Sequence, residues 1–148
     1  MVKVLVFDDE PFVINYLVKS LQDFYGWKGD KEIIFISTVN EFLFEIIHNA
    51  NEYDLFMLDV MAPVPSVGFK GLLSKEETNK MDDGMSTGLV FAEKIRKLKE
   101  KAPVLFLTAR NIPPIPESEK GYTAYIRKPA SPKEISDKMN ELLEFGKN

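Results

Sequence analysis

Five polar residues stand directly behind short apolar runs of the sequence. They are Asp8 and Asp9 after residues 4–7, Asp59 after residues 55–58, Thr108 after residues 104–107, and Lys128 after residues 124–127. Carboxylates that converge repel one another unless a cation joins them. A site made only of oxygen ligands suits Mg²⁺ better than zinc. The residue types therefore indicate magnesium and phosphoryl chemistry.

Each residue type has a distinct role in such chemistry. A carboxylate such as Asp59 can act as a nucleophile and form an acyl phosphate. Transfer of a phosphoryl group depends mainly on positioning and on neutralising the charge on its oxygens. Lys128 offers a point charge to one of those oxygens, and Thr108 offers a hydroxyl donor to another.

The elements that would position these residues are short strands separated by longer amphipathic segments. The predicted strands are residues 4–7, 33–36, 55–58, 104–107 and 124–127. Strands that are apolar throughout and alternate with helices indicate a parallel sheet covered on both faces. We therefore expect a doubly wound five-stranded parallel α/β fold. Its carboxyl edge, where ligands bind in such folds, would collect all five polar residues.

Helical spacing and capping patterns predict the helices between the strands. The expected apolar stripes are Val13, Leu17, Leu21 and Phe24; Phe42, Leu43, Ile46 and Ile47; Phe91, Ile95 and Leu98; and Ile135, Met139, Leu142 and Leu143. Thr38 with Glu41, and Ser131 with Glu134, fit the capping box of a helix start. His48 is expected to be exposed near a helix end.

Two segments interrupt this alternation. Residues 62–87 are rich in proline and glycine, and a loop of that length is often functional. Within it, residues 74–80 are expected to form a short helix. Residues 111–121 contain three prolines, so no full-length helix is expected there before Pro116.

Four motifs in order resemble the receiver domain of two-component response regulators. They are V-L-V-F-D-D-E-P, Y-D-L-F-M-L-D-V-M, V-L-F-L-T-A and A-Y-I-R-K-P. Their order and their places at the strand ends match that family across most of the chain, excluding residues 62–83. The resemblance implies a flavodoxin-like, CheY-like fold with an insertion after the third strand.

The resemblance also implies roles for individual residues. Asp59 matches the phosphoacceptor, and Asp8 and Asp9 match the acidic pair that binds Mg²⁺. Met61 matches the position that gives a backbone carbonyl to the metal. Thr108 and Tyr125 match the pair that switches on activation. The remaining matches are Lys128, the lysine that contacts the phosphoryl group; Pro129, which often follows it in cis; Ala109, the small residue beside that group; and Gly88, which opens the third helix of the family.

Composition limits the remaining possibilities. The chain has 148 residues, no cysteine, one histidine and a formal net charge of −4. We expect one receiver domain over residues 1–148, with the insertion at approximately residues 62–83. No signal peptide or membrane span is evident, so we expect a cytoplasmic protein without membrane insertion. The acidic balance argues against direct contact with nucleic acid.

The implied partner is a histidine kinase or phosphotransfer protein that donates the phosphoryl group. No effector domain is expected after the last helix, so output would come from contact with a downstream protein or from passing the phosphate on. The chain would lose its phosphate by slow hydrolysis without being an enzyme that acts on a metabolite. Two alternatives stay open: a phosphohydrolase with Asp8 as nucleophile, and a pseudo-receiver that only binds. In the insertion, Phe69, Leu72 and Leu73 either cover the domain or form a docking patch.

Overall fold

The computed structural model describes residues 1–62, 72–81 and 84–146. The strands are β1 (Val2–Phe7), β2 (Lys31–Ile36), β3 (Leu55–Asp59), β4 (Val104–Thr108) and β5 (Thr123–Arg127). The α-helices are α1 (Pro11–Phe24), α2 (Val39–Asn49), α3 (Lys75–Met81), α4 (Thr87–Leu98) and α5 (Pro132–Gly146). Two short 3₁₀ helices are η1 (Ala50–Glu52) and η2 (Glu117–Glu119).

All strand pairs of the sheet are parallel, in the order β2-β1-β3-β4-β5. The predicted doubly wound five-stranded fold is therefore confirmed. The five strands contain the five predicted apolar runs, and each is longer than predicted by one or two residues. The strand order reverses at β1, because the chain moves to β2 on one side and then to β3 on the other.

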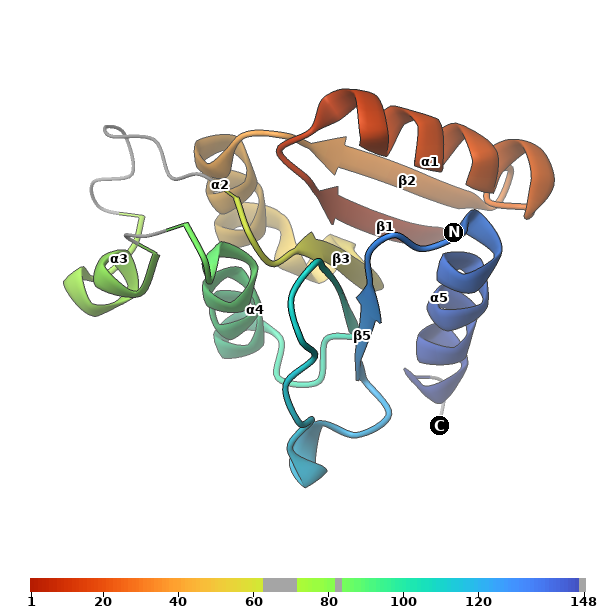
Figure 1. The fold of residues 1–148 in the computed structure, drawn as a ribbon. Coiled ribbons are helices and arrows are strands. Elements are labelled where there is room, and N and C mark those ends of the chain that lie inside the picture. The colour runs from red at the N-terminus through yellow and green to blue at the C-terminus, as the bar shows by residue number, and fades with distance from the viewer. Residues whose placement is uncertain (63–71, 82–83, 147–148) are drawn as a thin grey trace.

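Helices cover both faces of the sheet, as Figure 1 shows. In β1, Val4 and Val6 belong to the apolar cluster under α1 and α5, whereas Leu5 and Phe7 belong to the cluster under α2 and α4. This alternation follows from the two-residue period of a strand. Because both clusters are buried, the register of β1 is fixed, and so is the place where the chain turns after Phe7.

The predicted stripe of α1 is partly wrong. Leu17 and Leu21 are buried, but the side chains of Val13 and Phe24 are 54% and 78% exposed. Ile14 and Val18 take the inner positions instead, so the buried face is rotated by one residue. Leu98 in α4 is also exposed, whereas Phe91 and Ile95 are buried as predicted. The predicted stripes of α2 and α5 are confirmed, with Ile47 and Leu143 partly buried, and His48 is exposed at the end of α2.

The predicted short helix after β3 is confirmed as α3. The N–H of Ser74 donates to the Glu77 carboxylate (2.8 Å), and the N–H of Glu77 donates to the Ser74 hydroxyl (3.1 Å), which forms a capping box. Leu72 and Leu73 pack against the cluster under α2 and α4, so for these two residues the covering interpretation holds. Phe69 lies outside the described residues, as do the other residues of 63–71 and 82–83.

The connection from β4 to β5 contains the short helix η2 and no α-helix, and all of its residues are described. The prediction from its three prolines is therefore confirmed. Each of the other connections between strands contains at least one α-helix. No helix in the described part of the chain combines the length and the apolar character needed to cross a bilayer.

Candidate metal and phosphoryl site

The carboxyl edge of the sheet brings together the polar residues that follow the strands. Phe7 pairs with Leu58 between β1 and β3, which places Asp8 beside Asp59. Asp59 pairs with Leu107 between β3 and β4, which places Thr108 one position further on. Because parallel strands end at the same edge, four strands each contribute a polar side chain to one candidate site.

Asp8, Asp9 and Asp59 each offer a carboxylate oxygen, and these oxygens lie within 4.8 Å of one another. The Asp8 and Asp59 side chains are buried, whereas Asp9 is half-buried. The N–H of Glu10 donates to Oδ1 of Asp8 (2.9 Å) and so fixes the orientation of that carboxylate. Three oxygen donors at this spacing, with one open to water, fit the preference of Mg²⁺ for oxygen ligands and bound waters.

Lys128 lies between two of these carboxylates. Its Nζ is 3.4 Å from Oδ1 of Asp59 and 3.5 Å from Oδ2 of Asp8. The backbone N–H of Lys128 donates to the Thr108 carbonyl (2.8 Å), which holds the chain after β5 against the end of β4. The Lys128–Pro129 peptide bond is cis, as the resemblance led us to expect.

The crowded carboxylates shift the titration of the site. Burial raises the pKa of Asp59 to about 7, and the charges of Asp8 and Asp9 add to this, while Lys128 opposes it. Burial would lower the pKa of the Lys128 ammonium, but Asp59 and Asp8 outweigh that effect and raise it. Lys128 therefore stays charged at neutral pH. Its single charge does not neutralise the neighbouring carboxylates, so a bound cation would stabilise their ionised forms.

Gly88 explains how α4 can begin so close to Asp59. A Cβ at this position would lie 2.3 Å from the Asp59 carbonyl oxygen, so only glycine fits. The N–H of Gly88 donates to the Val60 carbonyl (3.0 Å). Nearby, the N–H of Ala62 donates to the Gly84 carbonyl (3.1 Å), and the Thr87 hydroxyl donates to the Ala62 carbonyl (2.8 Å). The two ends of the long β3–α4 connection are thus joined directly after Asp59.

Thr108 is buried, and its hydroxyl oxygen accepts a hydrogen bond from the N–H of Arg110 (3.0 Å). The Arg110 side chain extends across to the start of α4, where Nη1 donates to the Met85 carbonyl (3.0 Å). Arg110 could not be singled out from the sequence, because a single arginine after a strand has no pattern that distinguishes it from a surface charge. Only the fold places Met85 opposite it.

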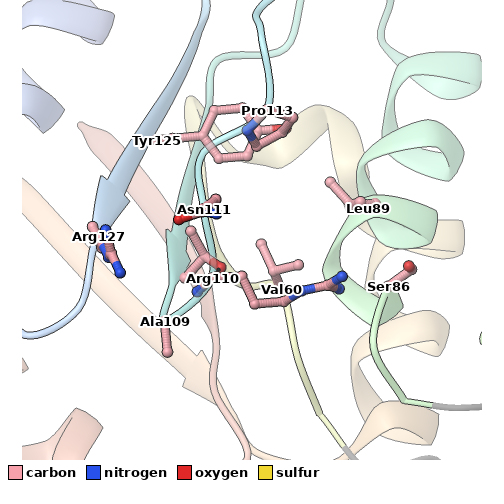
Figure 2. A pocket seen from close by; sticks show the side chains of 10 residues that line it. Val60, Ser86, Leu89, Ala109, Arg110, Asn111, Pro113, Tyr125 and Arg127 are labelled. Atoms are coloured by element: carbon pink, nitrogen blue, oxygen red, sulfur yellow. Dashed lines mark hydrogen bonds between the residues drawn. The ribbon is translucent and has the colours of Figure 1, made fainter.

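Tyr125 is half-buried and stacks on Phe106, with ring centroids 4.7 Å apart. It lines a cavity of about 570 Å³ together with Thr108, as well as Val60 and Leu89 on the opposite side (Figure 2). The two residues that the resemblance paired as a switch therefore share one cavity. The side chain of Met61 packs against the apolar cluster under α2 and α4.

Comparisons with known proteins extend these observations. No protein-family model matches the chain. The transcriptional regulatory protein LytR of Staphylococcus aureus, in strains N315 and NCTC 8325 / PS 47, is 30% identical over 140 residues. The match covers 95% of this chain and 46% of LytR, so the chain spans about half the length of these relatives.

Solved structures with the same fold include the response regulator TrrA of Thermotoga maritima, in complex with Mg²⁺ and BeF. TrrA is 27% identical with a TM-score of 0.63, and the match covers 96% of this chain and 99% of TrrA. A CheY-like receiver domain protein of Methanospirillum hungatei JF-1 has a TM-score of 0.64 at 22% identity, covering 99% and 98% of the two chains. Motifs, topology and both comparisons agree: the chain has the fold of the receiver domains of two-component response regulators and is similar to them in sequence.

Proposed function

We propose that Asp59 of this receiver domain accepts a phosphoryl group in a magnesium-dependent reaction. One observation carries the proposal: the carboxylates of Asp8, Asp9 and Asp59 converge within 4.8 Å, with the Lys128 ammonium 3.4 Å from Asp59. The arrangement supplies a nucleophile, ligands for a cation, and a positive charge for the incoming group. Asp59 is the nucleophile because it is the last residue of the central strand β3 and lies between the other contributors.

In the proposed step, a carboxylate oxygen of Asp59 attacks the phosphorus atom of a phosphohistidine. The new P–O bond forms while the P–N bond breaks, and the imidazole nitrogen of the donor keeps that electron pair. Lys128 contacts one phosphoryl oxygen, and the Thr108 hydroxyl turns from its contact with Arg110 to donate to another. Slow hydrolysis reverses the modification, with water attacking phosphorus and the Asp59 carboxylate leaving. This gives the chain a regulatory cycle and no metabolite substrate.

Asp8, Asp9 and Asp59 would hold Mg²⁺ through carboxylate oxygens, with the backbone carbonyl of Met61 as a fourth protein ligand. When bound, the cation neutralises charge on the carboxylates and on the incoming phosphoryl oxygens. Asp8 is oriented for this role by its hydrogen bond from Glu10, and it also holds Lys128. The fit rests on three oxygen donors at one edge of the sheet.

The donor would be a histidine kinase or phosphotransfer protein that contacts α1. Phe12 and Tyr16 on this helix are 89% and 75% exposed, which is unusual for large apolar side chains that serve only packing. Next to them, a cavity of about 460 Å³ is lined by both α1 and the site residues Asp8 and Lys128. A helix of the donor that covers this surface would bring its phosphohistidine to the Asp59 edge.

We further propose that residues 1–148 form one cytoplasmic receiver domain, with the insertion at approximately residues 62–83. Its output would be a conformational change of Thr108 and Tyr125 that a downstream protein recognises. These two residues line one cavity, so movement of the Thr108 hydroxyl toward a phosphoryl group leaves space for the Tyr125 ring. TrrA was captured with Mg²⁺ and BeF, and by analogy the same pair of ligands is a suitable probe of this chain.

The direct test is labelling by acetyl phosphate, measured as intact mass. The wild-type chain is expected to gain one phosphoryl group in Mg²⁺ and none in EDTA, whereas Asp59→Asn gains none in either. Asp23→Asn, an exposed carboxylate on α1, is the control and should label as wild type. Labelling that survives in Asp59→Asn and disappears in Asp8→Asn would instead support the phosphohydrolase hypothesis. No labelling of any variant would leave a binding-only pseudo-receiver.

A further inference from the structure

The sheet lacks a covering α-helix at one position, between β4 and β5. The connections β2–α2–β3 and β3–α4–β4 move along the sheet in one direction, and right-handed crossovers place α2 and α4 on the same face. The connection from β4 to β5 continues in that direction and would place its helix beside α4. It contains only η2, so the β4–β5 end of this face has no α-helix, as Figure 1 shows.

A groove occupies that position. It consists of the cavity of about 570 Å³ near Thr108 and a second cavity of about 610 Å³ further along α4. Leu89 and Tyr125 line both cavities, so the two adjoin. The floor of the groove is apolar where they meet, because Leu89 and Tyr125 are half-buried there and Phe106 lies under the Tyr125 ring.

The groove is positively charged although the chain as a whole carries −4. Two carboxylates line the groove, compared with five cationic side chains. The cationic residues are Lys80, Arg96, Lys97, Arg110 and Arg127. At the end near Thr108, Arg110 donates to the neutral carbonyl of Met85. No carboxylate of the described residues forms an ion pair with Arg110 or Arg127. Within residues 1–62, 72–81 and 84–146, these two positive charges therefore have no acidic partner.

We propose that this groove binds an acidic amphipathic helix of a partner protein, which takes the place of the helix that the β4–β5 connection lacks. The apolar side of such a helix would cover Leu89 and Tyr125, as in other helix-in-groove complexes. If the helix runs parallel to α4, its first turn lies beside Arg110 and Arg127. Acidic residues are favoured in the first turn of a helix, so such a partner presents its carboxylates to these two arginines.

Peptide binding in EDTA tests this surface without relying on phosphorylation, so its failure is separate from failure of the Asp59 proposal. The probe is a fluorescein-labelled amphipathic peptide of about sixteen residues with aspartate and glutamate in its first turn. Its control has the same composition with those acidic residues moved to the last turn. Fluorescence anisotropy is expected to show binding of the first peptide at least about tenfold tighter than the second.

The matched protein variants are Arg110→Glu/Arg127→Glu and Lys19→Glu/Lys28→Glu, which change the net charge equally. The first should weaken binding of the acidic peptide at least about tenfold, and the second should not. Arg127→Glu alone keeps the Arg110 contact with Met85 and should give part of the loss. Amide shifts should map the peptide to Leu89, Ala92 and Tyr125.

Two results would overturn the proposal. Equal binding of both peptides, or shifts confined to α1, would show that the groove does not select an acidic helix. A wild-type dimer in sedimentation that Arg110→Glu/Arg127→Glu dissolves would assign the groove to a second copy of the chain.

Discussion

At the scale of single residues, Asp59 is held in conditions that oppose its own charge. Its side chain is 6% exposed, and Asp8 and Asp9 lie close by. Among the described residues, Lys128 is the cation that forms an ion pair with Asp59, and its charge does not prevent burial from raising the pKa of Asp59 to about 7. A second positive charge beside these carboxylates would therefore relieve the crowding, which costs stability in the free protein.

Because the ionised Asp59 carboxylate lowers the stability of the folded protein, we predict that Asp59→Asn stabilises the metal-free protein at high pH. Below about pH 4 the carboxyl is protonated in both folded and unfolded chains, so it costs nothing. Between pH 4 and 7 the unfolded chain ionises while the folded chain keeps its proton, so stability falls as pH rises. At pH 8 in EDTA we expect Asp59→Asn to gain at least about 1 kcal/mol, roughly 2–4 °C in Tm.

Thermal unfolding followed by circular dichroism at pH 4 and pH 8 measures this difference. Asp23→Asn, which removes an exposed carboxylate elsewhere, should change Tm little at either pH. A gain for Asp59→Asn that is equal at both pH values would argue against the proposed titration.

The residue types of the site could be predicted from the sequence because each directly follows an apolar strand. Arg110 could not be predicted in this way, since its structural role depends on a contact with Met85, which lies 25 residues away in the chain. The same limit applies to Lys128: its position at a strand end is visible in the sequence, but its contact with Asp8 depends on the cross-sheet arrangement.

At the scale of elements, the close approach of α4 to the end of β3 depends on Gly88. Gly88→Ala would place a Cβ 2.3 Å from the Asp59 carbonyl, and backbone cannot move aside as a flexible side chain can. We expect a loss of about 1–3 kcal/mol in the free energy of unfolding, measured by urea titration. Ser86→Ala is the control, because the Ser86 side chain makes no capping hydrogen bond. Equal stability of Gly88→Ala and wild type would contradict the proposed clash.

The helix α3 of the β3–α4 connection is attached to α4 through Glu77. Its carboxylate is buried, caps α3, and lies 3.4 Å from the Lys94 ammonium. Burial would raise the pKa of Glu77, but hydrogen bonds from Ser74 and the charges of Lys94 and Lys97 outweigh it and lower the pKa. The stability that this carboxylate contributes is thus present above the unfolded pKa and is lost as pH falls.

Glu77→Gln should therefore loosen α3 without unfolding the sheet. At pH 7 we expect amide exchange in residues 75–81 to accelerate roughly tenfold, which corresponds to about 1.4 kcal/mol. The difference should shrink as the pH approaches 4. Glu76→Gln changes a neighbouring carboxylate that is 83% exposed, and it should have little effect. Faster exchange across β1 and β3 as well would mean that Glu77 supports the whole fold.

Helix phase shows why some elements could be predicted only in outline. In α1, apolar residues at 12, 13, 14, 16, 17 and 18 give several possible stripes, and packing against α5 and the sheet selects Ile14, Leu17 and Val18. The strands left no such choice, because helices cover both faces of the sheet and each run is apolar except for Arg127 at the end of β5. The prolines before η2 likewise excluded a helix by a local rule, which needs no knowledge of tertiary contacts.

At the scale of the whole molecule, the proposed metal site joins strands from the centre of the sheet, so its occupancy should affect global stability. A ligand that binds only the folded state at ten times its Kd stabilises that state by about 1.4 kcal/mol. We expect Mg²⁺ to raise the Tm of wild type by several degrees at pH 8 and to have a much smaller effect on Asp59→Asn. Titration of Mg²⁺ during thermal unfolding measures both responses.

Two further variants, Asp23→Asn and Asp8→Asn, separate metal binding from a general salt effect. Asp23→Asn should respond to Mg²⁺ as wild type does, whereas Asp8→Asn, which removes a buried carboxylate of the same cluster, should respond weakly. NaCl at equal ionic strength should give none of the difference between variants, because screening acts mainly on exposed charges. If all four proteins gained the same stability from Mg²⁺, the carboxylate cluster would not be the binding site. If only wild type and Asp23→Asn gain stability from Mg²⁺, the crowded carboxylates that destabilise the free protein are the groups that bind the cation.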